Sequence, residues 1–262
     1  MLCLAICSAR SLTVLASQLE AKSSRSPKQP KATHTSQTLT IATVSLPPSV
    51  PTASNRFRSV NDPSLKEISR NPIKYRLWDT PGHGKLREAQ GTSQLLSMYD
   101  SKDANTKLRG IIFMVDTAGL SEDEILRDTA SYLHDVLLLL QKRILNKGKS
   151  SSKVAAEIPF LVAANKQDLF TALPLGSTRE KLEAEIDRVR KTRSKGLMDA
   201  GTADIEDEIL GNDGGSDSFS FKLLGEEVGI EVDVVGGAVM GDSNEAPGSG
   251  LGKWEEWIGM HL

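Results

Sequence analysis

The sequence predicts an α/β fold with a mainly parallel sheet, and two observations support this prediction. From about Lys74 onward, short apolar runs alternate with segments of helical periodicity, which is the pattern that strand–helix–strand units produce. Several of these runs lead directly into polar residues, and such residues at the carboxyl ends of buried strands mark the ligand-binding edge of an open α/β sheet. The 262 residues, 39% hydrophobic and 25% charged, suit one sizeable domain or two small ones.

Four segments have the character of buried or half-buried strands. They are Lys74–Asp79, Ile111–Asp116, Pro159–Ala164 and Ile230–Val235. The first two end in an aspartate, and the third runs directly into Asn165–Asp168. These polar ends are the places to look for a ligand site.

Helices are predicted between these strands. The clearest runs from about Ser121 to Leu145, where Ser121 can cap the helix with Glu124 three residues later and the apolar residues form one stripe. A second helix is predicted over about Thr178–Arg193. The tryptophans of Trp254–Ile258 indicate a short amphipathic helix at the carboxyl end.

Two stretches predict irregular structure. Residues 1–60 carry seven Lys or Arg against one acid, Glu20, and are rich in Ser, Thr and Pro, a composition that buries little apolar surface. We therefore expect residues 1–30 to be an irregular basic segment, as a misassigned gene start would produce, and residues 31–262 to form the domain. Residues 199–217 hold seven acids and no base, and are expected to be a flexible acidic excursion.

Composition also excludes several classes of function. A net charge of −2 gives no basic excess for binding DNA. The two cysteines, Cys3 and Cys7, lie together and the four histidines are scattered, so neither a disulfide framework nor a Cys/His metal cluster is expected. No stretch reaches the roughly 18 to 20 apolar residues of a spanning helix, and Met1–Leu19 makes a poor signal peptide.

The strongest functional signal is Asn165-Lys166-Gln167-Asp168, directly after an apolar strand. A carboxylate at Asp168 can accept hydrogen bonds from the N1 and N2 donors of guanine, and adenine lacks both donors in that geometry. Asn165 can tie neighbouring loops together and approach the other edge of the base, while the Lys166 stem can lie over the ring plane. The alternative is a plain polar strand-to-helix loop.

The second signal is Asp79-Thr80-Pro81-Gly82-His83. Asp79 at a strand end can hold Mg²⁺ through water, and the Gly82 N–H can meet a γ-phosphate. His83 stands where a nucleotide hydrolase places its water-orienting residue, although an isolated histidine after a glycine is otherwise plain loop structure.

A competing string, Asp116-Thr117-Ala118-Gly119, has the same Asp-x-x-Gly pattern. A nucleotide-sensing turn should be followed by a helix, a strand and another helix before the base-recognising strand, and only Asp79–Gly82 satisfies that order. Asp116 is therefore expected to end the intervening strand, beside the start of the long helix.

The sequence has no G-x-x-x-x-G-K-[ST] phosphate loop, whose backbone N–H groups cradle the β-phosphate. Gly148-Lys149-Ser150 has the right ending, but Arg143 stands where the first glycine belongs. This string also follows the long helix instead of the first strand, so we interpret it as a solvated loop.

In combination, these motifs resemble those of a small GTPase-type domain, and more closely the beta subunits of the signal recognition particle receptor of the fungal type. The resemblance covers about Lys31 to Leu262. Its further segments are Ala32–Thr38 for the first switch, Asp79–Arg87 for the second, Leu182–Leu197 for the Arg-rich helix, and Phe219–Phe221 with Trp254–Ile258 for the carboxyl end.

The resemblance implies a P-loop GTPase-like three-layer sandwich, here expected to lack its first strand and P-loop. It implies GTP and Mg²⁺ as cofactors, with Thr35, or else Thr33, joining Asp79 at the metal and Gly236–Ala238 (Gly237 and Ala238 in particular) backing the guanine. Its implied partner is the receptor's alpha subunit, with ribosome or translocon reached indirectly, at the cytosolic face of the endoplasmic reticulum. The membrane anchor of the family is not found in this sequence.

Two other functions stay open at this level. One is a nucleotide-free GTPase-like module that keeps only the partner-binding surface. The other is a GTP-hydrolysing enzyme of the translation-factor kind, suggested by Asp79–His83 but lacking the β-barrel domains that follow in such enzymes. We favour a GTP-binding regulator over an efficient hydrolase.

Overall fold

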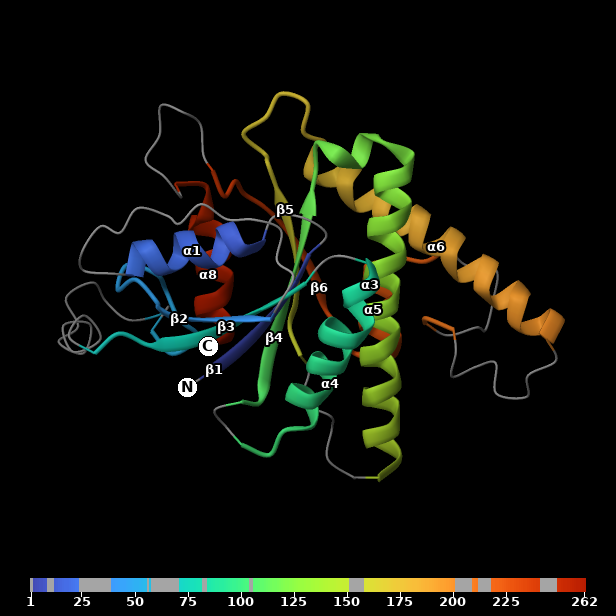
Figure 1. The fold of residues 1–262 in the computed structure, drawn as a ribbon, viewed down its shortest axis with the longest axis horizontal. Helices are drawn as coiled ribbons and strands as arrows, with labels where there is room; N and C mark the ends of the chain where they lie inside the picture. Colours follow the sequence, from blue (N-terminus) through green and yellow to red (C-terminus); the bar gives the residue numbers. More distant parts are fainter. Residues whose placement is uncertain are drawn as a thin grey trace.

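The computed structural model describes residues 2–8, 12–23, 39–55, 57, 71–81, 84–103, 106–150, 158–200, 209–211, 218–240 and 249–262. In this part of the chain a six-stranded sheet runs through the middle of the molecule in the order β2-β3-β1-β4-β5-β6 (Figure 1). The strands are β1 (Leu2–Ser8), β2 (Thr40–Ser45), β3 (Lys74–Thr80), β4 (Leu108–Asp116), β5 (Phe160–Asn165) and β6 (Val232–Gly236). Only the β2–β3 pair is antiparallel.

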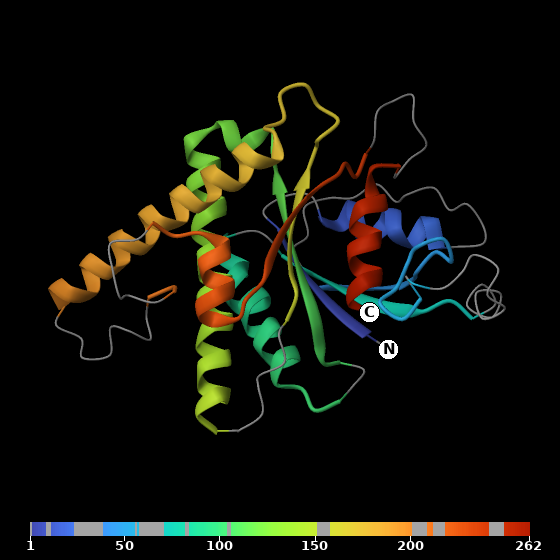
Figure 2. The same cartoon turned by 180° about the vertical axis from the view of Figure 1, so that it is seen from behind.

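Helices cover both faces of this sheet, as the two opposite views agree (Figures 1 and 2). The first face carries α1 (Leu12–Ser23) and α8 (Gly252–His261). The second carries α3 (Gly84–Leu86), α4 (Ser93–Asp100), α5 (Asp123–Ser150), α6 (Leu175–Ala200) and α7 (Phe221–Val228). A short π-helix, Arg87–Thr92, joins α3 to α4. Single 3-10 turns precede α5 (Gly119–Ser121) and α8 (Ser249–Leu251).

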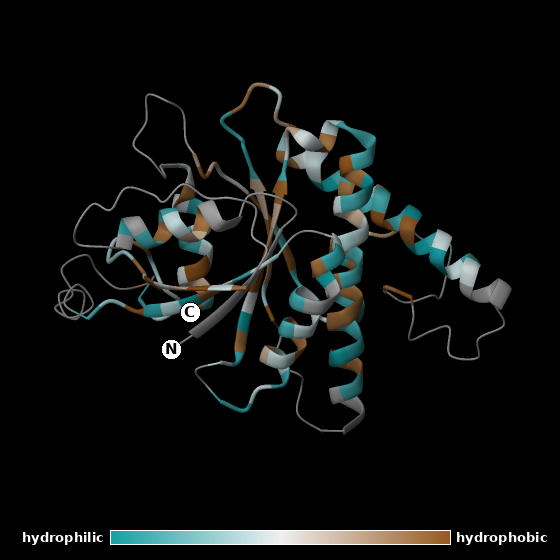
Figure 3. Cartoon of the chain, in the orientation of Figure 1, coloured by the Kyte–Doolittle hydropathy of each residue, from teal (hydrophilic) through white to brown (hydrophobic). Residues whose placement is uncertain are grey.

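The core consists of two apolar clusters, one on each face of the sheet. Successive residues of β4 point to opposite faces, so Phe113 belongs to the cluster under α5 and Met114 to the cluster under α1 and α8. Because both faces are covered, β4 and β5 are nearly continuous hydrophobic runs, and Figure 3 shows apolar residues concentrated along them. None of the described helices combines the length and apolarity that crossing a membrane requires.

The first strand is present, which corrects two expectations. Leu2–Ser8 forms β1 in the middle of the sheet, with Ile6 in register with Asp79 of β3 on one side and Ile112 of β4 on the other. The prediction of a missing first strand is therefore wrong. The prediction of an irregular segment over residues 1–30 is wrong for residues 2–8 and 12–23, which form β1 and α1, and residues 1, 9–11 and 24–30 lie outside the described residues. The averaged composition of residues 1–60 hid the short apolar run Leu2–Cys7, which is long enough to form a buried strand.

The four predicted strands and three predicted helices are confirmed, with bounds that differ by a few residues. The long helix begins at Asp123 instead of Ser121, because Gly119–Ser121 forms a separate 3-10 turn. The sequence analysis missed α1, β2, α4 and α7 in addition to β1. Each is short, and β2 lies at the edge of the sheet with half of its residues exposed.

The middle of the predicted acidic excursion is packed against the domain. Ile209 and Leu210 are buried, and the Gln141 side chain of α5 holds them in place. Its Nε2 donates to the Ile209 carbonyl at 2.8 Å, and its Oε1 accepts from the Gly211 N–H at 2.7 Å. Residues 201–208 and 212–217 lie outside the described residues, so the expectation of flexibility is corrected only at this anchor.

Candidate functional site

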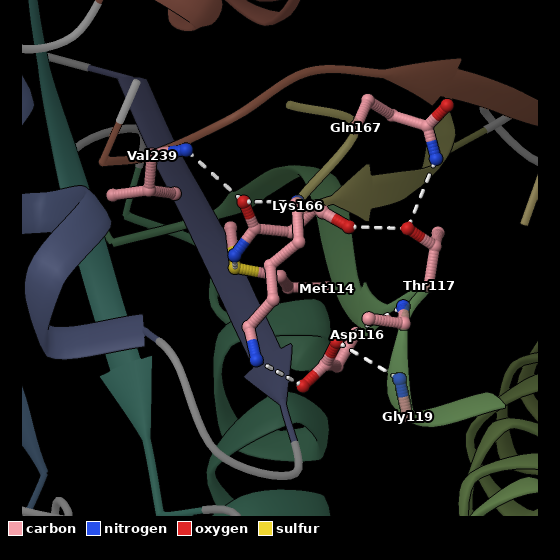
Figure 4. Close-up of polar contacts among 9 residues, drawn as sticks. Met114, Asp116, Thr117, Gly119, Lys166, Gln167 and Val239 are labelled. Atoms are coloured by element: carbon pink, nitrogen blue, oxygen red, sulfur yellow. Dashed lines mark hydrogen bonds and ion pairs between the residues drawn. The ribbon is translucent and has the colours of Figure 1, made fainter. Parts of the chain in front are cut away.

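The polar side chains at the ends of the second and third predicted strands meet at one edge of the sheet. Asp116 ends β4 and Asn165 ends β5, and the two residues are direct partners in the parallel register. The chain leaves β6 beside them through Gly237 and Val239. We call this group the β4–β5–β6 edge, made of Asp116–Gly119, Asn165–Asp168 and Gly237–Val239. Figure 4 shows its polar contacts, with Asp116, Lys166 and Val239 among the labelled residues.

Asn165 connects two of these segments. Its side chain is buried, and its Oδ1 accepts hydrogen bonds from the backbone N–H groups of Lys166 at 2.8 Å and Val239 at 3.0 Å. Its Nδ2 lies 3.7 Å from the sulfur of Met114. Asn165 therefore fixes the segment after β6 against the end of β5, which is the loop-tying role predicted for it.

Lys166 crosses from the end of β5 to the end of β4. Its φ of 67° is uncommon for a residue other than glycine, and its Nζ lies 2.6 Å from Oδ2 of Asp116. The other oxygen of Asp116 accepts from the backbone N–H groups of Ala118 and Gly119, both at 3.2 Å. The aliphatic stem of Lys166 is thus held at both ends, as Figure 4 shows.

Two polar residues that the sequence analysis gave no role complete the network. The Thr117 hydroxyl donates to the Asn165 carbonyl at 2.6 Å and accepts from Gln167 Nε2 at 2.9 Å. Gln167 Nε2 also donates to the Leu173 carbonyl at 3.0 Å. Their position directly after buried strands was the available signal, but the partners come from segments about fifty residues apart.

Gly237 and Ala238 lie against the same loop. The Gly237 N–H donates to the Ala164 carbonyl at 3.0 Å, and the Gly237 carbonyl accepts from the Gln167 N–H at 3.2 Å. A Cβ at position 237 would lie 2.5 Å from the Gly250 carbonyl oxygen and 2.8 Å from the Trp254 ring, so only glycine fits there. The structure brings these two residues beside Asn165–Gln167.

Asp168 differs from its neighbours because it is exposed. In the described part of the chain, no hydrogen bond or ion pair involves its carboxylate. A carboxylate next to a fixed loop, with both oxygens accessible, can accept two parallel hydrogen bonds from a planar ligand.

The other predicted signal lies at the carboxyl ends of β1 and β3, which we call the β1–β3 edge. Asp79 is buried there, and Thr40 Oγ1 donates to its Oδ2 at 3.3 Å. Gly82, His83, Thr33 and Thr35 lie outside the described residues. Within the described part, no group of three or more His, Cys, Asp or Glu side chains is placed to hold a metal ion.

The helical segment after Asp79 is attached to α5 by Arg87. Its guanidinium donates to both carboxylate oxygens of Asp128, at 2.8 and 2.7 Å, and lies 4.4 Å from the centroid of the Tyr132 ring. The order of elements after Asp79 is helix, β4, α5 and β5. Asp79, and not Asp116, therefore has the element order that the sequence analysis required of the nucleotide-sensing turn, and its role there stays a prediction.

Comparison with known proteins places the chain in a family. Residues 33–228 match the family model described as the signal recognition particle receptor beta subunit. The chain belongs to the signal recognition particle receptor beta subunit family. The beta subunit of Saccharomyces cerevisiae is 32% identical over 190 residues, which is 71% of this chain and 66% of the yeast protein. The human beta subunit is 30% identical over 178 residues, or 68% of this chain and 56% of the human protein. The chain thus spans less than two thirds of these relatives' length.

Solved structures of receptor beta subunits have the same fold. The SRb–GDP–Mg structure from Chaetomium thermophilum is 30% identical with a TM-score of 0.65, covering 100% of this chain and 99% of that one. The SRb–GTP/SRX complex from the same organism is 31% identical with a TM-score of 0.66, covering 99% of this chain and 97% of that one. The predicted P-loop GTPase-like sandwich is therefore confirmed as the fold class.

Proposed function

We propose that this chain is a guanine-nucleotide-binding beta subunit of the signal recognition particle receptor and pairs with the alpha subunit in co-translational protein targeting. The observation that carries the proposal is the organised loop Asn165–Asp168 at the β4–β5–β6 edge, on the fold of a family whose solved members hold GDP with Mg, or GTP with SRX. Its role is that of a GTP-binding regulator and not of an efficient hydrolase.

In this proposal the base is recognised by residues of the β4–β5–β6 edge. Asp168 accepts hydrogen bonds from N1 and N2 of guanine, and the Lys166 stem, held by Asp116, lies over the ring. Asn165 positions the loop, and Gly237 and Ala238 back the base. The residues present fit guanine, because the exposed carboxylate stands next to a loop whose own polar groups are already paired.

The phosphates and Mg²⁺ would meet the β1–β3 edge. We assign Asp79 and Thr35 as magnesium ligands, Gly82 as the N–H donor to the γ-phosphate, and His83 as the residue that would orient water. When bound, the ion neutralises phosphate charge. The buried position of Asp79 at the end of β3 supports its assignment. The sequence between β1 and α1 does not fit a phosphate cradle, which is a loop whose backbone N–H groups surround a phosphate.

Partner and location follow from the family. The name of the family and the SRX complex of the Chaetomium thermophilum relative support the alpha subunit as partner and the endoplasmic reticulum membrane as the site of action. We further propose that the chain acts at the cytosolic face and reaches the ribosome or translocon only through the assembled receptor.

The proposal is tested by co-expressing the full chain with the receptor's alpha subunit and purifying either partner. We expect a stoichiometric complex, and a folded chain that fails to capture the alpha subunit would contradict the proposed partner.

The base assignment is tested with Asp168→Asn, whose amide nitrogen can donate to O2 of xanthine but whose single oxygen cannot accept from both N1 and N2 of guanine. We expect binding of xanthosine nucleotide to replace binding of guanosine nucleotide. The matched control is Glu256→Gln, which removes one exposed carboxylate on α8 and should leave guanine binding unchanged.

A further inference from the structure

We propose that this site distinguishes ligands by their base and not by their phosphates, so that guanosine, GMP, GDP and GTP bind this chain with nearly equal affinity. The inference rests on the proposed function, whose guanine site it makes more specific. It follows from the difference between the two edges that a nucleotide would touch.

The β4–β5–β6 edge, where the base would bind, is assembled without ligand. Asn165 Oδ1 already accepts from Lys166 and Val239, at 2.8 and 3.0 Å. Gln167 is held on both sides, by Thr117 at 2.9 Å through its side chain and by the Gly237 carbonyl at 3.2 Å through its backbone N–H. A base that enters such a site pays little for ordering the protein, and preorganisation of this kind favours affinity.

At the β1–β3 edge, where the phosphates would lie, the sequence after β1 lacks the residues of a phosphate cradle. β1 ends at Ser8 and α1 begins at Leu12, so only Ala9, Arg10 and Ser11 connect them, where a phosphate cradle needs eight positions with glycine at two of them. The first glycine of the whole sequence is Gly82. Without glycine, backbone N–H groups cannot easily converge on a phosphate, because the convergent conformations favour residues without a Cβ.

The lysine of a phosphate cradle is also missing from its place. A cradle has its lysine at the start of the first helix, whereas the first lysine of this chain, Lys22, lies near the other end of α1. There its Nζ pairs with Glu255 of α8 at 3.1 Å. The β4–β5–β6 edge therefore fits the base of GTP, whereas the connection between β1 and α1 does not fit the β- and γ-phosphates.

The size of the expected effect follows from the missing contacts. Each charge-assisted hydrogen bond contributes about tenfold in affinity, so a cradle of three would favour GTP over guanosine by about a thousandfold. Without them, we expect the four dissociation constants to lie within about threefold of one another.

The test measures dissociation constants by equilibrium dialysis of the full chain against guanosine, GMP, GDP and GTP, each with Mg²⁺, with adenosine and ATP for comparison. We expect the four guanine compounds to bind alike and the two adenine compounds not to bind. Asp168→Ala should lower the affinity for all four guanine compounds by the same factor, while Glu256→Gln should change none of the four affinities.

Two results would overturn the inference. If GTP binds more than about a hundredfold more tightly than guanosine, the phosphates are recognised and only the proposed function stands. If no guanine compound binds to the folded chain, the inference fails, and capture of the alpha subunit then decides separately whether the proposed partner function also fails.

Discussion

The β4–β5–β6 edge and the β1–β3 edge belong to the same sheet, but they are built differently. At the first, buried Asn165 and the Lys166–Asp116 ion pair join three segments through short hydrogen bonds. At the second, Thr40 donates to the buried carboxylate of Asp79, and the connection after β1 carries no glycine. In our proposal, base recognition and phosphate recognition are therefore separable parts of one fold, because they depend on loops that follow different strands.

The largest expected effect comes from Asn165→Ala. Removing Oδ1 leaves the N–H groups of Lys166 and Val239 without their acceptor, and we expect the free energy of unfolding to fall by about 2 to 4 kcal/mol. Guanine binding should be lost as well. Urea denaturation and equilibrium dialysis measure the two effects.

Asn55→Ala is the matched control, because Asn55 is also buried and its Oδ1 accepts one backbone N–H, from Thr52 at 2.6 Å. It should lower stability by about 1 to 2 kcal/mol and leave guanine affinity unchanged. Equal loss of binding in both variants would contradict a specific role for Asn165.

Gly237→Ala should have the next largest effect. The added Cβ would lie 2.5 Å from the Gly250 carbonyl oxygen and 2.8 Å from the Trp254 ring, and such overpacking costs about 1 to 3 kcal/mol. Gly252→Ala is the control, because a Cβ there meets nothing within 4 Å and helix propensity favours alanine. A Gly237→Ala protein as stable as Gly252→Ala would show that this close packing does not exist.

On the other edge, Arg87→Ala should separate stability from base binding. The variant loses both hydrogen bonds to Asp128 and the contact with Tyr132, and we expect a loss of about 1 kcal/mol because Asp128 is largely exposed. Guanosine affinity should not change. The control is Arg143→Ala, which breaks the exposed pair with Asp100 and should lower the free energy of unfolding by less. If Arg87→Ala but not Arg143→Ala reduced guanosine affinity, the two edges would be energetically coupled, which would contradict this prediction.

The smallest expected effect is a dependence of stability on pH that involves neither edge. Burial by itself raises the pKa of Asp187, but hydrogen bonds from Lys191 and the Phe219 N–H, with the charges of Lys191 and Arg190, bring this pKa below its usual value. Because the folded chain favours the ionised form, Asp187 stabilises it above about pH 4 and this stabilisation is lost as the pH falls through the lowered pKa. Denaturation at pH 6 and pH 3.5 should show a smaller pH effect in Asp187→Asn than in Glu256→Gln.

Periodicity predicted four strands and three helices after Lys74 because each of these carries its own apolar pattern, whereas the short α4 and α7 were missed. β1 was not predicted, because residues 1–60 were judged by their overall composition. That composition is basic and Ser-rich, and it hides the short apolar run Leu2–Cys7. At the candidate site, Asn165–Asp168 could be recognised as a local motif. The partners of this loop could not, because Asp116, Thr117 and Val239 reach it only through the pairing of β4, β5 and β6.

In our proposal, the β4–β5–β6 edge is formed before any ligand arrives. Amide hydrogen exchange of the ligand-free full chain tests it most directly, at the N–H groups of Lys166, Gln167 and Val239. We expect all three to exchange slowly, since each donates to Asn165 or Gly237, and guanosine to slow them little further. Exchange at the rate of unprotected amides, with protection gained only when guanosine is added, would contradict the claim.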